Sequence, residues 1–412
     1  MFRKLLTFEE AKAAISQQLK PKPLGVEEMP LLEAHNRVLA ADAISTLDIP
    51  PFSRSTVDGF AVKAEDTFGA EENQPVKLNV CGTVNIGELP KIAIAKGEAA
   101  EIVTGAPVPD GADAVVMVED TERQGDVLQL YSSVTKGENV MRKGSDIRSG
   151  EAVLQAGAVL GSREIGVLAA LGWAKAKVWR VPVVAVLSTG AEVTEPGMAL
   201  PAGKIYDINA YSLCAAVLES GGKPVYRGVV PDETAVLRKT LQEALALADL
   251  AVTSGGVSVG PKDIIPQTVD SLGEPGVFVS GVAVKPGKPV TVALIGDKPV
   301  FSFPGHPASA LLMFHLLAKP VIQAMAGRAV KRMASVKAVA GSRMFSAKGR
   351  RTFVMVRLRS EGATLVAEPV ETGASGAITT LARADGFVAI AENAQFVDAG
   401  EEVAVTLLKE CA

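Results

Sequence analysis

Hydrophobic and polar positions follow different periods along the chain, and each period predicts a different kind of structure. The segment 7–20 carries apolar residues at helical spacing, and Thr7 with Glu10 three residues later is typical of a helix N-terminus. Pro21 should end this helix. From residue 48 to 147 the apolar runs are short and interrupted by glycine and proline, which favours a mostly β region.

The second half of the chain alternates apolar runs with amphipathic segments. The run 181–187 is continuously apolar, as expected of a strand that is covered on both faces. We expect helices at 162–171, 209–220, 232–248 and 308–325, with Ser162 and Asp232 as caps, and further strands at 225–230, 250–253, 290–294 and 300–303. This alternation is typical of a doubly wound sheet, which binds ligands outside the carboxyl ends of its strands. After residue 327 short strands return and indicate a small β-barrel or sandwich.

Composition narrows the classes of protein that this pattern allows. A chain of 412 residues is long enough for several domains, and its 48% hydrophobic residues can build a core in each. The net charge of −4 argues against nucleic acid or an anionic membrane as a partner, so any anion must be held by a local cluster of cations. The N-terminus is not a signal peptide, and no apolar run reaches the length of a membrane span. Three scattered cysteines without a C-x-x-C pair favour the reducing cytoplasm.

Two predicted loops of the doubly wound region carry residues suited to a ligand. Ser188, Thr189, Gly190 and Glu192 follow the first strand, and small hydroxyl residues there suit a phosphate or a pterin edge. The loop 253–263 follows a later strand. Its members Gly255, Gly256 and Ser258 let backbone N–H groups converge on an anion, while Asp263 is placed to hold a divalent ion. The loop lacks the ending of a Walker motif.

Two further segments of the same region offer donors to an oxyanion. In Lys285-Pro286-Gly287-Lys288-Pro289 the prolines restrict the backbone and so aim two ammonium groups in a defined direction. Ser309 lies near the N-terminus of the predicted helix 308–325, where backbone N–H groups add further donors. We interpret His306 as a loop or capping histidine.

Three segments of the predicted β region can each be interpreted as purely structural or as functional. Asp58 either caps a turn beside Gly59 or presents a carboxylate to a ligand. Thr104 lies in a proline-rich segment that either forms a tight loop or brings backbone close to a ligand. Asp146 follows two cations, which suits a surface ion pair or a charged ligand.

The ordered set of these segments resembles the molybdopterin molybdenumtransferase family, which includes the bacterial molybdenum-insertion enzymes and the E domain of gephyrin. The motifs D-G-F-A, T-G-A-P-V-P-x-G-A-D, S-G-G-V-S-V-G-x-x-D, K-P-G-K-P and P-G-x-P-x-S occur in that order, and the resemblance extends from about residue 7 to 408. This chain departs from many relatives at Ala191, Ser145, Val57, His306 and Gly281.

The resemblance implies a multidomain α/β plus β fold. Its parts are a linking elongated domain at 24–47 and 148–180, an inserted mostly β domain at 48–147, a doubly wound pterin-binding domain at 7–23 and 181–327, and a C-terminal barrel-like β domain at 328–412. It further implies a cytoplasmic homodimer with shared active sites that inserts molybdate into adenylylated molybdopterin, uses Mg²⁺, releases AMP and receives its substrate from a molybdopterin adenylyltransferase.

The resemblance also implies roles for particular residues. Carboxylates and lysines would be catalytic, namely Asp58, Asp146, Asp232, Asp263, Lys285 and Lys288. Three of the acidic residues would hold Mg²⁺, namely Glu192, Asp232 and Asp263. The substrates would contact Thr104, Ser188, Thr189, Gly190, Gly255, Gly256, Ser258, Pro289, Ser309, Arg350 and Ser375.

Two other functions fit parts of the sequence. Residues 256–260 read G-x-S-x-G, and Asp297 and His306 follow in the order of a serine hydrolase, although Ser258 lies several residues beyond the predicted strand. A pterin-binding scaffold that has lost turnover is the second alternative. Four predicted site residues are acidic, which argues against a scaffold, because several carboxylates would not help a protein that only binds anions. These residues are Asp58, Asp146, Asp232 and Asp263.

Overall fold

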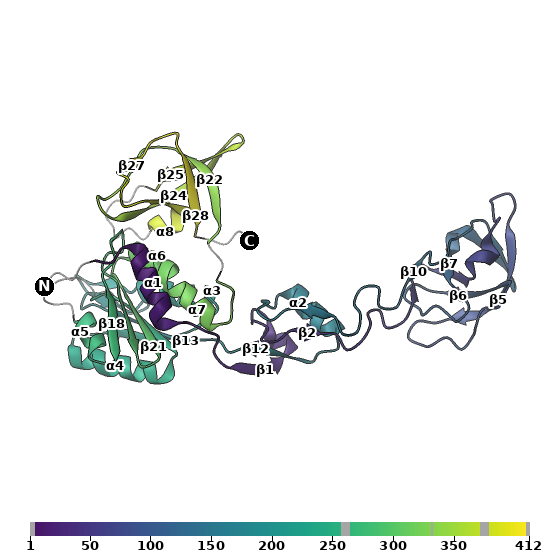
Figure 1. Ribbon diagram of the computed structural model, residues 1–412, viewed down its shortest axis with the longest axis horizontal. Helices are drawn as coiled ribbons and strands as arrows, with labels where there is room; N and C mark the ends of the chain where they lie inside the picture. Colours follow the sequence, from purple (N-terminus) through teal and green to yellow (C-terminus); the bar gives the residue numbers. More distant parts are fainter. Residues whose placement is uncertain (1–4, 257–263, 331–332, 371–378, 409–412) are drawn as a thin grey trace. The chain divides into compact units, whose positions relative to one another are not determined.

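The computed structural model describes residues 5–256, 264–330, 333–370 and 379–408, and it divides into two compact units (Figure 1). Unit 1 comprises Met1–Glu28, Asn36–Ala40 and Lys177–Ala412, and unit 2 comprises Met29–His35 and Ala41–Ala176. The strands β1 (Val26–Pro30) and β12 (Lys175–Trp179) lie where the chain passes from one unit to the other.

A six-stranded sheet forms the centre of unit 1, with the strand order β16-β13-β17-β21-β20-β18. Its strands are β13 (Val183–Thr189), β16 (Lys223–Val230), β17 (Leu250–Ser254), β18 (Pro275–Ser280), β20 (Thr291–Ile295) and β21 (Lys298–Phe303). The first four strands in this order pair in parallel, which confirms the predicted doubly wound region. The predicted strands at 290–294 and 300–303 instead form the antiparallel hairpin β20-β21, because the turn between them is too short for a parallel crossover.

Helices cover both faces of this sheet. They are α1 (Phe8–Leu19), α3 (Asn209–Glu219), α4 (Thr234–Leu247), α5 (Ile265–Asp270), α6 (Pro307–Met313), the π-helical segment η4 (Phe314–Ala318) and α7 (Lys319–Met325). Alternate residues of β13 enter different cores: Val186 packs with α1, α3, α6 and α7, and Leu187 packs with α4 and α5. Figure 1 shows α4 and α5 on the opposite side of the sheet from α1 and α6.

The helix that runs without interruption from Pro307 to Met325 is apolar enough to resemble a membrane span, with a mean hydropathy of 1.4. Within unit 1, however, 61% of its most apolar window is buried. Phe314 and Ile322 belong to the main core cluster and are fully buried. Packing against the sheet therefore accounts for the hydropathy of this helix.

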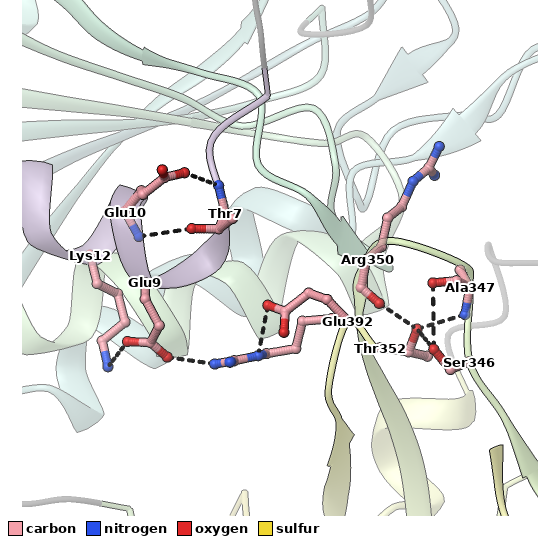
Figure 2. A network of polar contacts seen from close by, with 10 residues as sticks. Thr7, Glu9, Glu10, Lys12, Ser346, Ala347, Arg350, Thr352 and Glu392 are labelled. Carbon is pink, nitrogen blue, oxygen red and sulfur yellow. Dashed lines mark hydrogen bonds and ion pairs between the residues drawn. The ribbon is translucent and has the colours of Figure 1, made fainter. Parts of the chain in front are cut away.

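The sequence predicted N-terminal caps for three helices, and the structure confirms one of them. At α1 the Thr7 hydroxyl accepts a hydrogen bond from the Glu10 amide at 3.2 Å, and the Glu10 carboxylate accepts one from the Thr7 amide at 2.7 Å, which confirms the predicted cap (Figure 2). The expected cap at Asp232 is wrong, because α4 begins two residues later and has no side-chain cap. The expected cap at Ser162 is also wrong, because that residue is already the first helical residue of α2 (Ser162–Ala170).

The C-terminal part of unit 1 is a closed barrel of five strands. It runs in the order β24-β25-β22-β28-β26, and β26 pairs with β24 to close the ring. The barrel strands are β22 (Ser335–Ala340), β24 (Arg351–Glu361), β25 (Thr364–Pro369), β26 (Gly386–Ile390) and β28 (Glu402–Leu407), and nearby lie β23 (Met344–Phe345), β27 (Phe396–Val397) and α8 (Thr379–Arg383). The short strand β19 (Val284–Lys285) pairs with β24, so the lysine-bearing loop and the barrel share one sheet.

Unit 2 is mostly β, as predicted for residues 48–147. Its main sheet has the order β7-β4-β6-β5-β9-β8. The strands of the unit are β2 (Ala43–Ile44), β3 (Arg54–Ser55), β4 (Gly59–Val62), β5 (Val76–Val84), β6 (Glu98–Ile102), β7 (Ala114–Met117), β8 (Thr121–Gln124), β9 (Val127–Leu130), β10 (Val140–Met141) and β11 (Ala152–Leu154). Phe60, Leu128 and Leu130 form part of its separate core.

Candidate functional site

A cavity of about 690 Å³ lies at the carboxyl ends of β13, β17 and β21 in unit 1. This is the edge at which parallel sheets of this kind bind ligands. Polar residues, glycines and apolar residues all line it: Ser188, Thr189, Gly190, Glu192, Val193, Ile205, Tyr206, Asp207, Ile208, Asn209, Asp232, Ser254, Gly255, Gly256, Pro289, Pro304, Gly305, His306 and Pro307. Eight of the residues predicted from the sequence therefore lie around one cavity, namely Ser188, Thr189, Gly190, Glu192, Asp232, Gly255, Gly256 and Pro289.

Close backbone contact between two loops shapes the cavity. Gly255 follows β17 with a φ of +97°, and a Cβ atom there would lie 2.2 Å from the carbonyl oxygen of Thr189 at the end of β13. Only glycine fits such an approach. The two loops therefore bring their backbones together at the cavity, and the Gly255 amide is held there by its hydrogen bond to the Phe303 carbonyl at 3.1 Å.

Two acidic side chains at the cavity are suited to a cation. Glu192 and Asp232 both line the cavity and are exposed. Within the part of the chain that the structure describes, neither carboxylate has a hydrogen bond or an ion pair. They are therefore free to accept a metal ion or an ordered water.

The lysine-bearing loop lies against the helix that carries Ser309. Gly287 has a φ of +102°, and a Cβ atom there would lie 2.5 Å from Cγ of Met313 and 3.8 Å from the carbonyl oxygen of Ser309. Pro289 of the same loop lines the cavity. The ammonium groups of Lys285 and Lys288 have no partner among the described residues. The structure thus places two unpaired cations on the loop that borders the cavity.

Strand pairing brings an arginine to the same loop. Lys285 is opposite Thr352 in the β19–β24 pair, so Arg350 is two residues from that contact. Figure 2 shows the Arg350 side chain pointing away from the polar contacts of Thr352. Its neighbour Arg351 instead pairs with Glu9 and, at 3.2 Å, with Glu392. Of the two arginines, Arg350 is therefore the one whose charge remains available to an anion.

Sequence reasoning missed Asp207 and Asn209, whose hydrogen bonds organise one side of the cavity. Asp207 is 3% exposed and accepts hydrogen bonds from the Ser188 hydroxyl at 2.9 Å and the Ala210 amide at 3.0 Å. Asn209 donates to Ser254 Oγ at 2.8 Å and to the Gly305 carbonyl at 2.7 Å. The available signal was an Asp and an Asn at the start of an apolar-striped helix, Asp207 two residues before α3 and Asn209 as its first residue, where such side chains are common.

His306 stands at the start of α6 and lines the cavity, but its side chain makes no capping hydrogen bond. The predicted loop position is thus confirmed and the capping role is not. Asp297 precedes β21 and His306 follows it, so a strand of six residues, roughly 20 Å long, separates the two. They cannot form the acid–base pair of a serine hydrolase.

The predicted residues of unit 2 lie at loops of its sheet. Asp58 accepts hydrogen bonds from the Thr104 amide at 2.6 Å and the Thr104 hydroxyl at 2.9 Å. These two bonds lower the pKa of the Asp58 carboxyl and hold it in the charged form. Asp58 therefore bonds across to Thr104 instead of capping its own turn. Lys143 pairs with Asp48 at 3.6 Å, so the ion pair expected beside Asp146 involves another acid.

Three residues predicted for the site, Ser258, Asp263 and Ser375, lie outside the described residues. Among the residues that are described, no group of three or more His, Cys, Asp or Glu side chains could hold a metal ion. Any divalent ion at the cavity would thus depend on fewer protein ligands together with ligand oxygens.

Comparison with known proteins gives matches over most of the chain. Residues 6–172 match the MoeA N-terminal region (domains I and II), residues 185–324 match a probable molybdopterin-binding domain, and residues 337–408 match the MoeA C-terminal region (domain IV).

Individual relatives agree with these matches. The molybdopterin molybdenumtransferase of Nostoc sp. is 34% identical over 387 residues, which cover 93% of this chain and 88% of that protein. The enzyme of the same name from Bacillus subtilis is 32% identical, covering 93% and 90%. The solved structure of the molybdopterin biosynthesis MoeA protein from Pyrococcus horikosii matches with a TM-score of 0.86 and 42% identity over 99% of this chain and 100% of that one.

Proposed function

This chain belongs to the molybdopterin molybdenumtransferase family, and we propose that it inserts molybdate into adenylylated molybdopterin and releases AMP and active molybdenum cofactor. Its similarity to relatives at 32–34% identity over most of the chain identifies it as a transferase of molybdenum cofactor biosynthesis that inserts molybdenum. The adenylylated form of the substrate and the release of AMP are the parts that we add.

One observation supports this proposal above all others. A glycine-rich cavity at the strand ends borders a loop with two lysines, Lys285 and Lys288, whose ammonium groups have no partner in the described part of the chain. The cavity suits a phosphate-bearing heterocycle, because Gly255 and Gly256 carry no side chains that would keep a phosphate away from the backbone there. The lysines, with Arg350 and Ser309, suit a tetrahedral dianion, since charged donors bind oxyanions most strongly. Both substrates of the reaction thus have matching surfaces on neighbouring loops.

Mg²⁺ fits the acidic side of the cavity. This ion is often bound by only one or two carboxylates together with phosphate oxygens and water. Glu192 and Asp232 are two exposed carboxylates without partners among the described residues, and the sequence places Asp263 on the adjoining loop. When bound there, Mg²⁺ would neutralise phosphate charge as the bond to AMP is cut.

The residues of the chain then have separate tasks. The backbone at Gly255 and Gly256 would hold the phosphates, and Ser188 with Thr189 would contact the bound substrate. Lys285 and Lys288 would hold molybdate until the dithiolene sulfurs replace two of its oxygens, which leave as two water molecules with the two thiol protons and two protons from solvent. AMP leaves when water adds to the phosphoanhydride bond.

We further propose a cytoplasmic homodimer with shared active sites. Asp58 and Asp146 of one chain would complete the cavity of its partner, so acids and lysines would meet between subunits. A molybdopterin adenylyltransferase would supply the substrate. We expect no nucleic acid or membrane as partner, because the net charge of −4 provides no general attraction to polyanions.

A reconstituted reaction tests the proposal. The protein is incubated with adenylylated molybdopterin, Mg²⁺ and molybdate, and both AMP and active cofactor should appear. Omitting molybdate should suppress AMP release. Binding of the pterin without any turnover would contradict the proposal and favour a scaffold. Labelling by a fluorophosphonate probe would favour the hydrolase, because the transferase has no activated serine.

A further inference from the structure

We infer that the floor of the cavity recognises N–H donors of a planar heterocycle through Ser188 Oγ and Asn209 Oδ1, and that it does not bind phosphate. This inference rests on the proposed function, since it concerns how that substrate is oriented. It depends on the direction of each hydrogen bond around Ser188, Asp207 and Asn209.

The proton of the Ser188 hydroxyl is committed to Asp207. The Ser188 hydroxyl donates to Asp207 Oδ1 at 2.9 Å. The same carboxylate oxygen accepts from the Ala210 amide at 3.0 Å. Ser188 Oγ therefore has only lone pairs left to offer the cavity. A phosphate oxygen, which is itself an acceptor, would find no donor there.

A second chain of hydrogen bonds orients the amide of Asn209. Ser254 donates its proton to the Pro304 carbonyl at 3.1 Å, so its oxygen must accept from Asn209 at 2.8 Å. The Gly305 carbonyl can also only accept, and it lies 2.7 Å from the same nitrogen. Both N–H groups of Asn209 Nδ2 therefore donate hydrogen bonds. This assigns the nitrogen and the oxygen of the side-chain amide.

The oxygen of Asn209 remains without a partner. Oδ1 is buried and makes no hydrogen bond to any residue that the structure describes, although Asn209 lines the cavity. A buried acceptor without a donor is unfavourable, because it has lost its hydrogen bonds to water. A ligand N–H that enters beside Asn209 would satisfy it.

The carboxylate behind this floor is held in place from the other side. Tyr226 Oη lies 3.3 Å from both Asp207 Oδ2 and Glu195 Oε1. Burial, together with the charges of Asp207 and Glu195, raises the pKa of Tyr226, so this phenol keeps its proton and serves as a donor. Tyr226 is therefore a positioning residue that keeps Asp207 turned toward Ser188.

The floor thus selects for amino or ring N–H groups. In adenylylated molybdopterin, the pterin carries a 2-amino group beside a ring N–H, and adenine carries an amino group. Either edge supplies the same chemistry. The phosphates would then lie away from the floor, toward the backbone of Gly255 and Gly256.

Binding measurements without molybdate test this inference. The dissociation constant of adenylylated molybdopterin is compared among the wild type, Ser188→Ala and Asn209→Leu. Loss of one hydrogen bond should weaken binding about tenfold in each variant. Thr253→Val is the matched control, because Thr253 Oγ1 is also buried without a partner but does not line the cavity. This control should bind like the wild type.

Competition experiments then distinguish the two possible donors. If molybdopterin competes less well in the variants and AMP competes equally, the pterin edge contacts the floor. If AMP competes less well, and the wild type prefers AMP to purine riboside monophosphate, which has neither an amino group nor a ring N–H, the adenine amino group does. Unchanged binding of the full substrate in both variants would overturn the inference, and so would an equal loss of affinity for inorganic pyrophosphate.

Two further measurements keep the test decisive. Thermal unfolding confirms that each variant is folded, and if Asn209→Leu is not, Ser188→Ala, which removes a single atom, decides alone. AMP release in the presence of molybdate is followed separately. A wild type that releases no AMP would contradict the proposed function, whereas an active enzyme with unchanged binding in the variants would contradict only this inference.

Discussion

Lys288 is the side chain whose removal most directly tests the oxyanion pocket. Its ammonium group has no partner among the described residues, and its neighbour Pro289 lines the cavity. Removing one cation from a charged hydrogen-bond cluster costs about 2–3 kcal/mol, roughly a thirty- to hundredfold loss of affinity. Lys288→Ala should raise the half-saturating molybdate concentration by that factor, measured by AMP release. Lys239→Ala, on the exposed face of α4, is the control, and an unshifted molybdate curve for Lys288→Ala would remove Lys288 from the pocket.

Two consecutive arginines should respond differently to the same substitution. Arg350→Ala should weaken molybdate binding and leave the thermal midpoint nearly unchanged, because its charge is unpaired within the described residues. Arg351→Ala should instead lower stability by about 1–2 kcal/mol, since Arg351 pairs with Glu9 and Glu392 and stacks over the Phe8 ring at 5.3 Å. Molybdate titration and thermal unfolding of both variants separate the roles, and the reverse pattern would contradict them.

At the scale of the element, the π-helical segment η4 buries a histidine. His315 is 7% exposed, and its Nδ1 has no hydrogen-bond partner within the described ranges. Burial, with a smaller contribution from the charge of Lys319, lowers the pKa of His315 from 6.5 to about 4. Between these values the unfolded chain binds a proton that the folded chain does not. Stability should therefore fall as the pH drops below about 6.5, and become independent of this group above it.

This pH dependence can be measured by denaturant unfolding. The wild type should lose about 2 kcal/mol between about pH 7 and about pH 5 through His315 alone. His315→Leu should remove that part of the loss. His35→Gln, at an exposed position, is the control and should retain it. An equal loss in the wild type and His315→Leu would show that His315 does not carry the effect.

At the scale of the whole molecule, the proposed sharing of sites predicts complementation between inactive chains. Asp58→Ala and Lys288→Ala homodimers should each be strongly impaired. Mixed dimers should regain about one functional site of the two, because one cavity then receives an intact acid and an intact lysine. Activity is measured after subunit exchange, with heterodimers isolated by two different affinity tags. Heterodimers that remain inactive would count against shared sites.

The sequence alone determined which segments form helices or strands and the order of these elements along the chain. Apolar spacing located the helices α1, α3 and α6–α7 and the parallel strands β13, β16 and β17, because burial on one or both faces imposes its own period. Helix starts were harder to predict. Aspartate is a common capping residue, but Asp232 lines the cavity instead. The helix α4 begins two residues after it. The short elements α5 and β18 were not predicted, because six residues are too few to show a clear hydrophobic periodicity.

Only the tertiary structure decided which polar groups are available to a ligand. The sequence identified Ser188 and the lysine-bearing loop, but it could not show that Asp207 takes the proton of Ser188 or that Arg351 is paired with Glu9, a residue far away in the chain. Spacing along a chain reports local periodicity and strand ends. Hydrogen-bond direction and ion pairing depend on partners that folding brings together, so they become visible only when the distances between those partners are known.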